Sequence, residues 1–98
     1  MPEPRHWYIV MYDITDPKDL RRTYRLLRSW GKPVQYSVFR VRATGREIAQ
    51  LRFEIGRIID VDDRLTIVRL CESCASRMVT TGRLLDDSGR EVPHCFIV

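Results

Sequence analysis

The sequence predicts one α+β domain, in which helices cover one face of a mainly antiparallel sheet. Three observations predict this class. Residues 7–12 are all apolar or aromatic, and the run is too short for a stable helix. Two later segments, 17–31 and 44–59, carry apolar residues at helical spacing behind helix-capping residues. Extended segments precede, separate and follow these helices, so the predicted order is β, α, one or two β, α, β, β.

The first strand shows no alternation of apolar and polar residues, so we expect both of its faces to be buried in the centre of the sheet. It ends at Asp13, and Asp16-Pro17 then forms a helix N-cap followed by proline at the first helical position. The strand therefore brings the Asp13 carboxylate to a strand-to-helix corner, a common place for ligand binding. Two interpretations stay open: Asp13 binds a ligand, or it only turns the chain.

The first helix has one apolar face and one basic face. At about 100° per residue, Tyr24 and Leu27 fall within roughly 40° of Leu20, and Gly31 is expected to end the helix. No acid at i,i+4 neutralises the basic face, so it either contacts phosphate or is only solvated. The basic face consists of Lys18, Arg21, Arg22, Arg25, Arg28 and Lys32.

Residues 33–43 are expected to be extended, as one bent strand or two short ones. Their alternation breaks at Val38-Phe39, which indicates a bulge, a bend or a tight hairpin. Arg40 and Arg42 share a face and are expected to extend the basic surface. Phe39 either stacks on a base or packs in the core.

A capping box, Thr44-Gly45-Arg46-Glu47, begins the second helix. Its outward positions carry mixed charge, so we expect a structural role. The apolar stripe is Ile48, Leu51, Ile55, Ile58 and Ile59, and the outward residues are Arg46, Glu47, Gln50, Glu54 and Arg57.

The rest of the chain is expected to add a strand at 65–71, a turn or short helical piece at 71–77 and a short strand at 78–80. Residues 82–98 form a tail, with a turn at 87–89 and an apolar end at 95–98 that should pair with a sheet edge of its own chain or of a partner. Residues 1–98 are thus predicted to form one ferredoxin-like βαββαβ sandwich with an extra C-terminal strand.

Composition favours a polyanionic partner. The 98 residues carry a net charge of +4, and all but two of the 17 basic residues are arginine, whose planar fork of donors matches phosphate. A chain this small also gains from a partner subunit. We see no apolar signal segment and no run of membrane-spanning length, so a cytoplasmic location without membrane contact is expected.

Three cysteines, Cys71, Cys74 and Cys95, argue against a disulfide framework. Cys71 and Cys74 have metal-ligand spacing, but the chain lacks a second such pair. The alternatives are a metal or redox role and small, half-buried thiols without a role.

Three segments resemble a known family. Residues 10–16 (VMYDITD) and 34–39 (VQYSVF) resemble the first two signatures of the Cas2 family of CRISPR-associated proteins, and Arg69-Leu70-Cys71 with Cys74 resembles a third. The resemblance covers roughly residues 7–81. It implies a ferredoxin-like homodimer that works with the Cas1 integrase in spacer acquisition.

The resemblance also implies that Asp13 of each protomer converges near the dimer axis and holds magnesium, or manganese in its place. The implied activity is that of an endonuclease or endoribonuclease, although members differ in whether they cleave RNA, DNA or nothing. Asp13 is the expected catalytic and metal-binding residue. Thr23 breaks the arginine spacing that is common in the family's first helix. The expected DNA or RNA contacts are Arg21, Arg22, Arg25, Arg28, Arg40 and Arg42, and candidate supporting residues are Tyr12, Asp16, Ser37 and Phe39.

Two hypotheses therefore stay open. The chain is a metal-dependent phosphodiesterase centred on Asp13, in which magnesium acidifies water and neutralises charge on the phosphate. Alternatively, it is a non-catalytic dimeric scaffold that grips DNA and bridges Cas1 integrase subunits. The basic face serves both hypotheses and does not discriminate between them.

Overall fold

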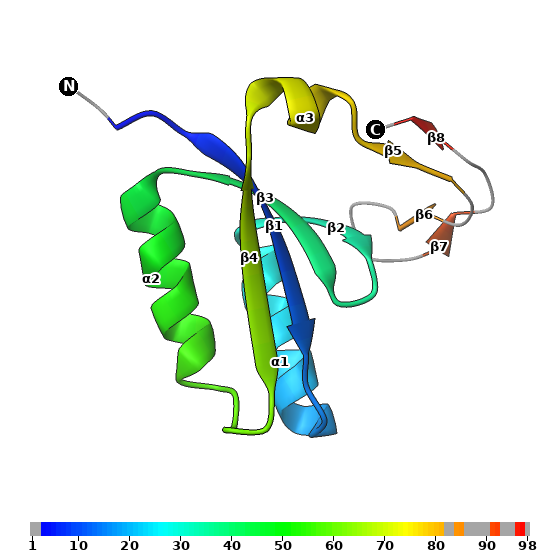
Figure 1. Ribbon diagram of the computed structural model, residues 1–98. Helices are drawn as coiled ribbons and strands as arrows, with labels where there is room; N and C mark the ends of the chain where they lie inside the picture. Colours follow the sequence, from blue (N-terminus) through cyan, green and yellow to red (C-terminus); the bar gives the residue numbers. More distant parts are fainter. Residues whose placement is uncertain (1–2, 82–83, 86–90, 93–95, 98) are drawn as a thin grey trace.

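A computed structural model describes residues 3–81, 84–85, 91–92 and 96–97 of the chain. Its centre is a four-stranded antiparallel sheet in the order β2-β3-β1-β4, with α1 and α2 on one side (Figure 1). This is the predicted ferredoxin-like arrangement, and the first strand is central as expected. The elements are β1 (His6–Asp13), α1 (Pro17–Arg28), β2 (Gly31–Gln35), β3 (Val38–Ala43), α2 (Gly45–Gly56) and β4 (Arg64–Leu70).

The core lies between the helices and one face of the sheet. Alternate residues of β1 and β3 point into it, because successive side chains of a strand point to opposite faces. The helices complete the core with Leu27 of α1 and Leu51 and Ile55 of α2, all fully buried. The buried strand residues are Tyr8, Val10 and Tyr12 of β1 and Phe39, Val41 and Ala43 of β3.

The other face of β1 is only half-buried, at Trp7, Ile9 and Met11. The prediction that both faces of this strand are buried is therefore wrong for the single chain. In register, Ile9 lies between Arg40 of β3 and Val68 of β4. The face of the sheet opposite the helices thus has an apolar centre that the described chain does not fully cover; we call it the open face.

The start of α1 follows its sequence signals. The backbone N–H of Asp19 donates to Asp16 Oδ2 at 2.9 Å, and Pro17 occupies the first turn. The helix ends at Arg28, earlier than the Gly31 that we predicted, and Gly31 instead begins β2. A Cβ atom at Gly31 would overlap the carbonyl oxygen of Arg40, so glycine is required there by the close approach of β2 to β3 rather than by the helix end.

The alternatives for residues 33–43 are resolved in favour of two strands. A tight turn at Tyr36 and Ser37 joins β2 to β3, and Ser37 has a left-handed φ of 65°. The pairing also shifts register between Pro33 and Gln35, as at a bulge. Phe39 is completely buried, so it packs in the core and does not present its ring to a base.

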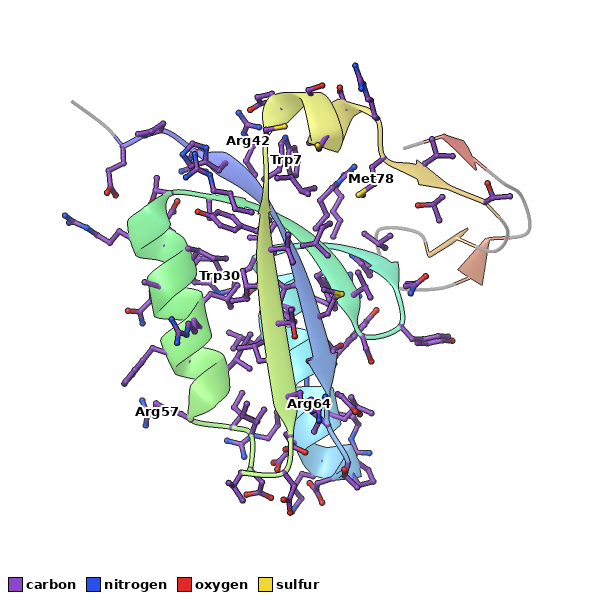
Figure 2. The ribbon with its side chains drawn as sticks, in the orientation of Figure 1. Trp7, Trp30, Arg42, Arg57, Arg64 and Met78 are labelled. Atoms are coloured by element: carbon purple, nitrogen blue, oxygen red, sulfur yellow. The ribbon has the colours of Figure 1, made fainter. Side chains whose placement is uncertain are left out.

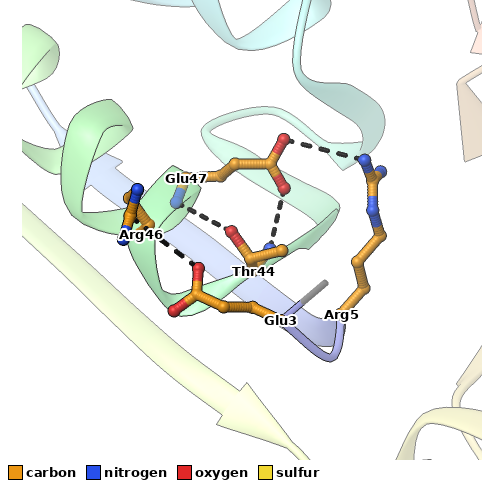
Figure 3. Close-up of polar contacts among 5 residues, drawn as sticks. All are labelled: Glu3, Arg5, Thr44, Arg46 and Glu47. Carbon is orange, nitrogen blue, oxygen red and sulfur yellow. Dashed lines mark hydrogen bonds and ion pairs between the residues drawn. The ribbon is translucent and has the colours of Figure 1, made fainter. Parts of the chain in front are cut away.

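The predicted capping box starts α2. The Glu47 N–H donates to Thr44 Oγ1 at 3.1 Å, and the Thr44 N–H donates to Glu47 Oε1 at 2.9 Å (Figure 3). Arg5 reaches the same Glu47 carboxylate at 3.8 Å. The helix ends at Gly56, so Ile58 and Ile59 of the expected stripe lie beyond it, although Ile59 still packs against the core.

The C-terminal part forms two small sheets beside the main one. Residues 72–76 form the expected short helix, and the apolar end of the chain pairs with its own chain, antiparallel to the strand at 79–80. A second strand pair in the tail was not predicted, and the expected turn at 87–89 lies outside the described residues. These elements are α3 (Glu72–Ser76), β5 (Val79–Thr80), β6 (Leu84–Leu85), β7 (Glu91–Val92) and β8 (Phe96–Ile97).

Candidate nucleic-acid interface and metal site

Asp13 is the last residue of β1 and is exposed. It belongs to the same face of the strand as Ile9 and Met11, which is the open face. Across the sheet it lies opposite Arg64, the first residue of β4, which Figure 2 places at the lower end of the sheet. The structure thus puts the predicted carboxylate at the rim of the uncovered apolar surface.

The turn between β2 and β3 lies beside this strand end. The backbone N–H of Tyr12 donates to the carbonyl oxygen of Ser37 at 3.1 Å, which joins the turn to the residue before Asp13. Two predicted supporting residues, Tyr12 and Ser37, are therefore brought together. Asp16 is not part of this contact, because its carboxylate caps α1.

An aromatic cluster lies beneath the turn. The ring of Phe39 packs against Tyr24 with centroids 5.3 Å apart and against Tyr12 at 6.4 Å. Burial, and then the neighbouring Tyr24, raise the pKa of Tyr12 to about 12, so its hydroxyl stays neutral at physiological pH. Tyr12 is thus suited to donate a hydrogen bond but not to act as a base.

A largely apolar cleft of about 730 Å³ opens between α1 and the turn. Tyr36, which is 70% exposed, stands at its edge. Aromatic rings beside arginines suit nucleic acid, because bases stack on the rings and phosphates pair with the guanidinium groups. The lining residues are Tyr12, Leu20, Arg21, Tyr24, Arg25, Tyr36 and Ser37.

Five of the six residues predicted for the basic face of α1 are exposed on that helix, whereas Lys32 lies in β2. One acid partly neutralises this face, because the Asp19 carboxylate lies 3.9 Å from the Arg22 guanidinium. The two residues are at i,i+3, and our prediction considered only acids at i,i+4. Because this ion pair is exposed, it leaves most of the positive charge available. The exposed basic residues of the helix are Lys18, Arg21, Arg22, Arg25 and Arg28.

Part of this face forms one wall of a second cleft, of about 640 Å³, between α1 and α2. From α2 come Glu54, one of whose carboxylate oxygens is buried, and the adjoining Arg57. Our prediction that both residues face outwards holds for Arg57, which is exposed, but is wrong for Glu54, which is partly buried. Sequence reasoning missed them because the helix packing, and not the pattern of α2, brings them to the α1 arginines. The lining residues are Lys18, Arg22, Arg25, Leu26, Glu54, Arg57 and Ile58.

Arg40 and Arg42 form a separate basic patch. They share a face of β3 as predicted, but it is the open face, so they do not extend the surface of α1. Their guanidinium carbons lie 5.0 and 5.2 Å from the ring centroid of Trp7, and Figure 2 shows Trp7 beside Arg42. Glu72 accepts from Arg42 at 3.5 Å. The role of Trp7 in this patch depends on strand register, which the sequence alone does not display.

Among the described residues, one group of acids is close enough to share a metal ion, and it excludes Asp13. This group is Asp19, Asp60 and Asp63, whose ligand oxygens lie within 4.8 Å of one another. Asp63 already accepts from the backbone N–H groups of Thr15 at 3.2 Å and of Asp60 at 2.8 Å. These bonds tie the loop after β1 to the loop before β4, which gives the group a structural role.

No helix in the part of the chain that the structure describes is long and apolar enough to cross a membrane.

Known proteins resemble this chain along most of its length. The family described as CRISPR associated protein Cas2 matches residues 6–78. A Rhodospirillum rubrum protein named CRISPR-associated endoribonuclease Cas2 4 is 31% identical over 85 residues, which are 86% of this chain and 68% of that protein. A Methanospirillum hungatei protein named CRISPR-associated endoribonuclease Cas2 2 is 32% identical over 79 residues, which are 81% of this chain and 89% of that protein.

Two solved structures agree with this match. Streptococcus pyogenes Cas2 superimposes with a TM-score of 0.71 at 29% identity, over 78% of this chain and 99% of that one. A hypothetical protein from Thermus thermophilus superimposes with a TM-score of 0.66 at 28% identity, over 91% of this chain and 98% of that one. The family match spans the whole main sheet, both long helices and Asp13. The resemblance noted in the sequence is thereby confirmed, and the chain belongs to the CRISPR-associated protein Cas2 family.

Proposed function

We propose that this chain works as a homodimer in CRISPR adaptation and cleaves phosphodiester bonds of RNA or DNA in a metal-dependent reaction centred on Asp13. The observation that carries this proposal is the position of Asp13 at the rim of the open face. A second copy that packs on the same face brings its own Asp13 towards the first, because a two-fold interface uses the same surface twice. The endoribonuclease names of the curated relatives support the reaction class.

The carboxylate ligands fit a magnesium or manganese ion only when two copies of the chain each contribute Asp13. Carboxylate oxygens are hard ligands of the kind that magnesium takes, and the ion usually keeps several waters besides one or two carboxylates. In this proposal one chain supplies the Asp13 carboxylate, and the second copy supplies the other. When bound, the ion supplies an acidified water and a positive charge beside the phosphate.

The residues of the chain itself bind and orient the nucleic acid. The arginines of α1 neutralise phosphates, and the exposed Tyr36 offers a ring for a base. Tyr12 keeps its proton, and its hydroxyl belongs to the cleft beside α1, on the face of the sheet opposite to Asp13. His6 is at the opposite end of β1, where its Nδ1 lies 3.2 Å from Arg69, so it is not placed to serve as a base at Asp13.

Replacing Asp13 tests the proposal. Asp13→Asn keeps the shape and one acceptor oxygen but removes the charge that the metal needs, so cleavage of labelled RNA or DNA in magnesium should fall at least about 100-fold, as expected for loss of a metal ligand. Dimerisation and salt-dependent nucleic-acid binding should stay near the wild-type values. Asp62→Asn, the same change at an exposed loop position, should cleave normally. Wild-type cleavage by the purified Asp13→Asn protein would exclude Asp13 as the centre.

A specific observation favours the scaffold as a second candidate. Asp13 is not part of the acidic cluster found among the described residues. Two clefts on the helix side are lined by arginines, and Asp13 does not line either of them. A chain with no cleavage in magnesium or manganese that the Cas1 integrase nevertheless requires to insert DNA would establish the scaffold. In that case Asp13→Asn should leave insertion unchanged, whereas loss of the α1 arginines should reduce it.

A further inference from the structure

Cys71 and Cys74 lie close together at the junction between β4 and the C-terminal part. Cys71 follows β4 directly and Cys74 lies within α3, and both are exposed and not joined in a disulfide. The backbone N–H of Cys74 donates to Cys71 Sγ at 3.4 Å. The two side chains also affect each other's pKa, so they lie within interacting distance. The geometry therefore places the two cysteines side by side, with a backbone donor directed at the Cys71 sulfur.

The contact makes the two sulfurs unequal. Hydrogen bonds from the backbone and the side chain of Cys74 lower the pKa of the Cys71 thiol, whereas the side-chain hydrogen bond to Cys71 raises the pKa of Cys74. A thiolate is the nucleophile in thiol–disulfide exchange, and a neighbouring thiol resolves the mixed disulfide that it forms. Cys71 has the character of the attacking residue, and Cys74 that of the resolving residue.

We propose that Cys71 and Cys74 form a redox-active dithiol that exchanges reversibly with small disulfides, of which glutathione disulfide is the probe. The Cys71 thiolate attacks one sulfur of glutathione disulfide, breaks its S–S bond and releases one glutathione thiolate. Cys74 then loses its proton to solvent, and its sulfur attacks the Cys71 sulfur and releases the second glutathione thiolate. One disulfide forms in the protein, one is reduced in the glutathione, and two electrons pass between them.

The dithiol lies at the edge of the open face and away from Asp13. Glu72, between the two cysteines, accepts from Arg42, and the Arg42 guanidinium stacks on Trp7. Leu70, the residue before Cys71, pairs with Trp7, which is near the end of β1 opposite to Asp13. The proposal therefore stands or fails independently of the nuclease.

Intact mass spectrometry after alkylation tests the dithiol. The full chain carrying Cys95→Ser retains only these two thiols. After equilibration in glutathione buffers of increasing oxidised fraction, acid quenching and iodoacetamide treatment, a doubly labelled species should give way to an unlabelled monomer that lacks two hydrogen atoms. Dithiothreitol should restore double labelling. In the reduced protein, Cys71 should alkylate roughly tenfold faster than Cys74 at neutral pH, as expected of a thiolate-forming cysteine.

A variant of equal thiol content provides the matched control. In the same background, Cys74→Ser combined with Ser73→Cys moves the second thiol by one residue and should give mixed glutathione adducts in place of the unlabelled monomer. The proposal is overturned if the parent protein keeps both thiols in every buffer, or collects one glutathione on each cysteine, or links two chains. Protection from alkylation without loss of the two hydrogens, reversed by a chelator, would instead identify a metal site and also overturn it.

Discussion

Two aspartates only three residues apart in the chain have different surroundings. Asp16 accepts the Asp19 N–H and caps α1, which is a local role that its position before Pro17 already predicts. Asp13 is exposed at the rim of the open face. Its position opposite Arg64 follows from the pairing of β1 with β4, which are distant in the chain. The function proposed for Asp13 therefore depends on tertiary structure, whereas the role of Asp16 does not.

Thr23 is a polar residue on the buried side of α1. The structure buries it fully, and its hydroxyl has no hydrogen-bond partner. Thr23→Val replaces this hydroxyl by a methyl group of similar size with nearly equal helix propensity. Since an unpaired buried polar group is costly, we expect the free energy of unfolding to rise by about 1 kcal/mol. Thermal or urea unfolding measures the change.

Thr81→Val is the control for Thr23→Val, because Thr81 is exposed. It should alter the free energy of unfolding by less than about 0.5 kcal/mol. A less stable Thr23→Val protein would show that the hydroxyl has a partner in solution.

At the scale of elements, the two long helices differ in what their outer faces carry. The outer face of α1 is uniformly basic apart from Asp19, whereas α2 begins with a network of paired acids and bases (Figure 3). Each phosphate neutralised on duplex DNA contributes about −0.9 to the slope of log affinity against log salt. Arg22→Ala combined with Arg25→Ala should therefore flatten this slope by about 2 if each arginine contacts one phosphate.

The same loss of charge on α2 provides the control. Arg46→Ala with Arg52→Ala removes two exposed arginines and should leave the slope nearly unchanged. Equal effects of the two double variants would assign the α1 arginines to general charge attraction and not to specific phosphate contacts.

The start of α2 predicts a pH dependence. The hydrogen bond from the Thr44 backbone, followed by the charge of Arg5, holds the pKa of Glu47 below its usual 4.5. A lowered pKa in the folded state gives stability that is present above the unfolded pKa and is lost as pH falls through the folded pKa. Glu47→Gln should therefore lower the melting temperature at neutral pH, and its difference from wild type should shrink as pH falls below 4.5 and vanish below the lowered pKa of the folded state.

Thr44→Ser keeps the capping hydroxyl and should retain the wild-type pH profile. Melting curves between neutral and acid pH compare the three proteins. If the melting temperatures of Glu47→Gln and wild type differ by the same amount at all pH values, then packing and not the charge of Glu47 stabilises the start of the helix.

At the scale of the whole molecule, the helices cover one face of the sheet and leave the other open. Ile9 and Val68 are paired at the centre of the open face, and Val68 is 42% exposed. If two copies pack there, Val68→Glu places an unpaired charge in the interface and should weaken dimerisation at least about 100-fold, because burying an unpaired charge costs several kcal/mol. Sedimentation at micromolar concentration measures the change.

Val61→Glu is the matched control, because Val61 is 96% exposed in the loop before β4. It should sediment like wild type, and far-UV circular dichroism should show that both variants are folded. A Val68→Glu protein that remains dimeric would place the interface elsewhere.

The sequence alone determined most of the elements and the positions at which the two long helices begin. The Asp16-Pro17 signal, the capping box at Thr44 and the apolar run before Asp13 each depend on residues within a few positions, so the pattern predicts them directly. The family resemblance likewise rests on short contiguous segments. The end of α1 was predicted too late, because Gly31 is required by a contact with Arg40 and not by the helix.

Tertiary structure decided which predicted residues meet. Arg40 and Arg42 join Trp7 on the open face rather than the arginines of α1, and Arg57, directly after α2, lines the same cleft as two of the α1 arginines. Tertiary structure also decided that one side of β1 stays half-buried. An apolar strand sequence does not show which of its faces the helices of the same chain will cover. Local pattern sets the conformation of a segment, but strand register and helix packing set its neighbours, and these involve residues far apart in the sequence.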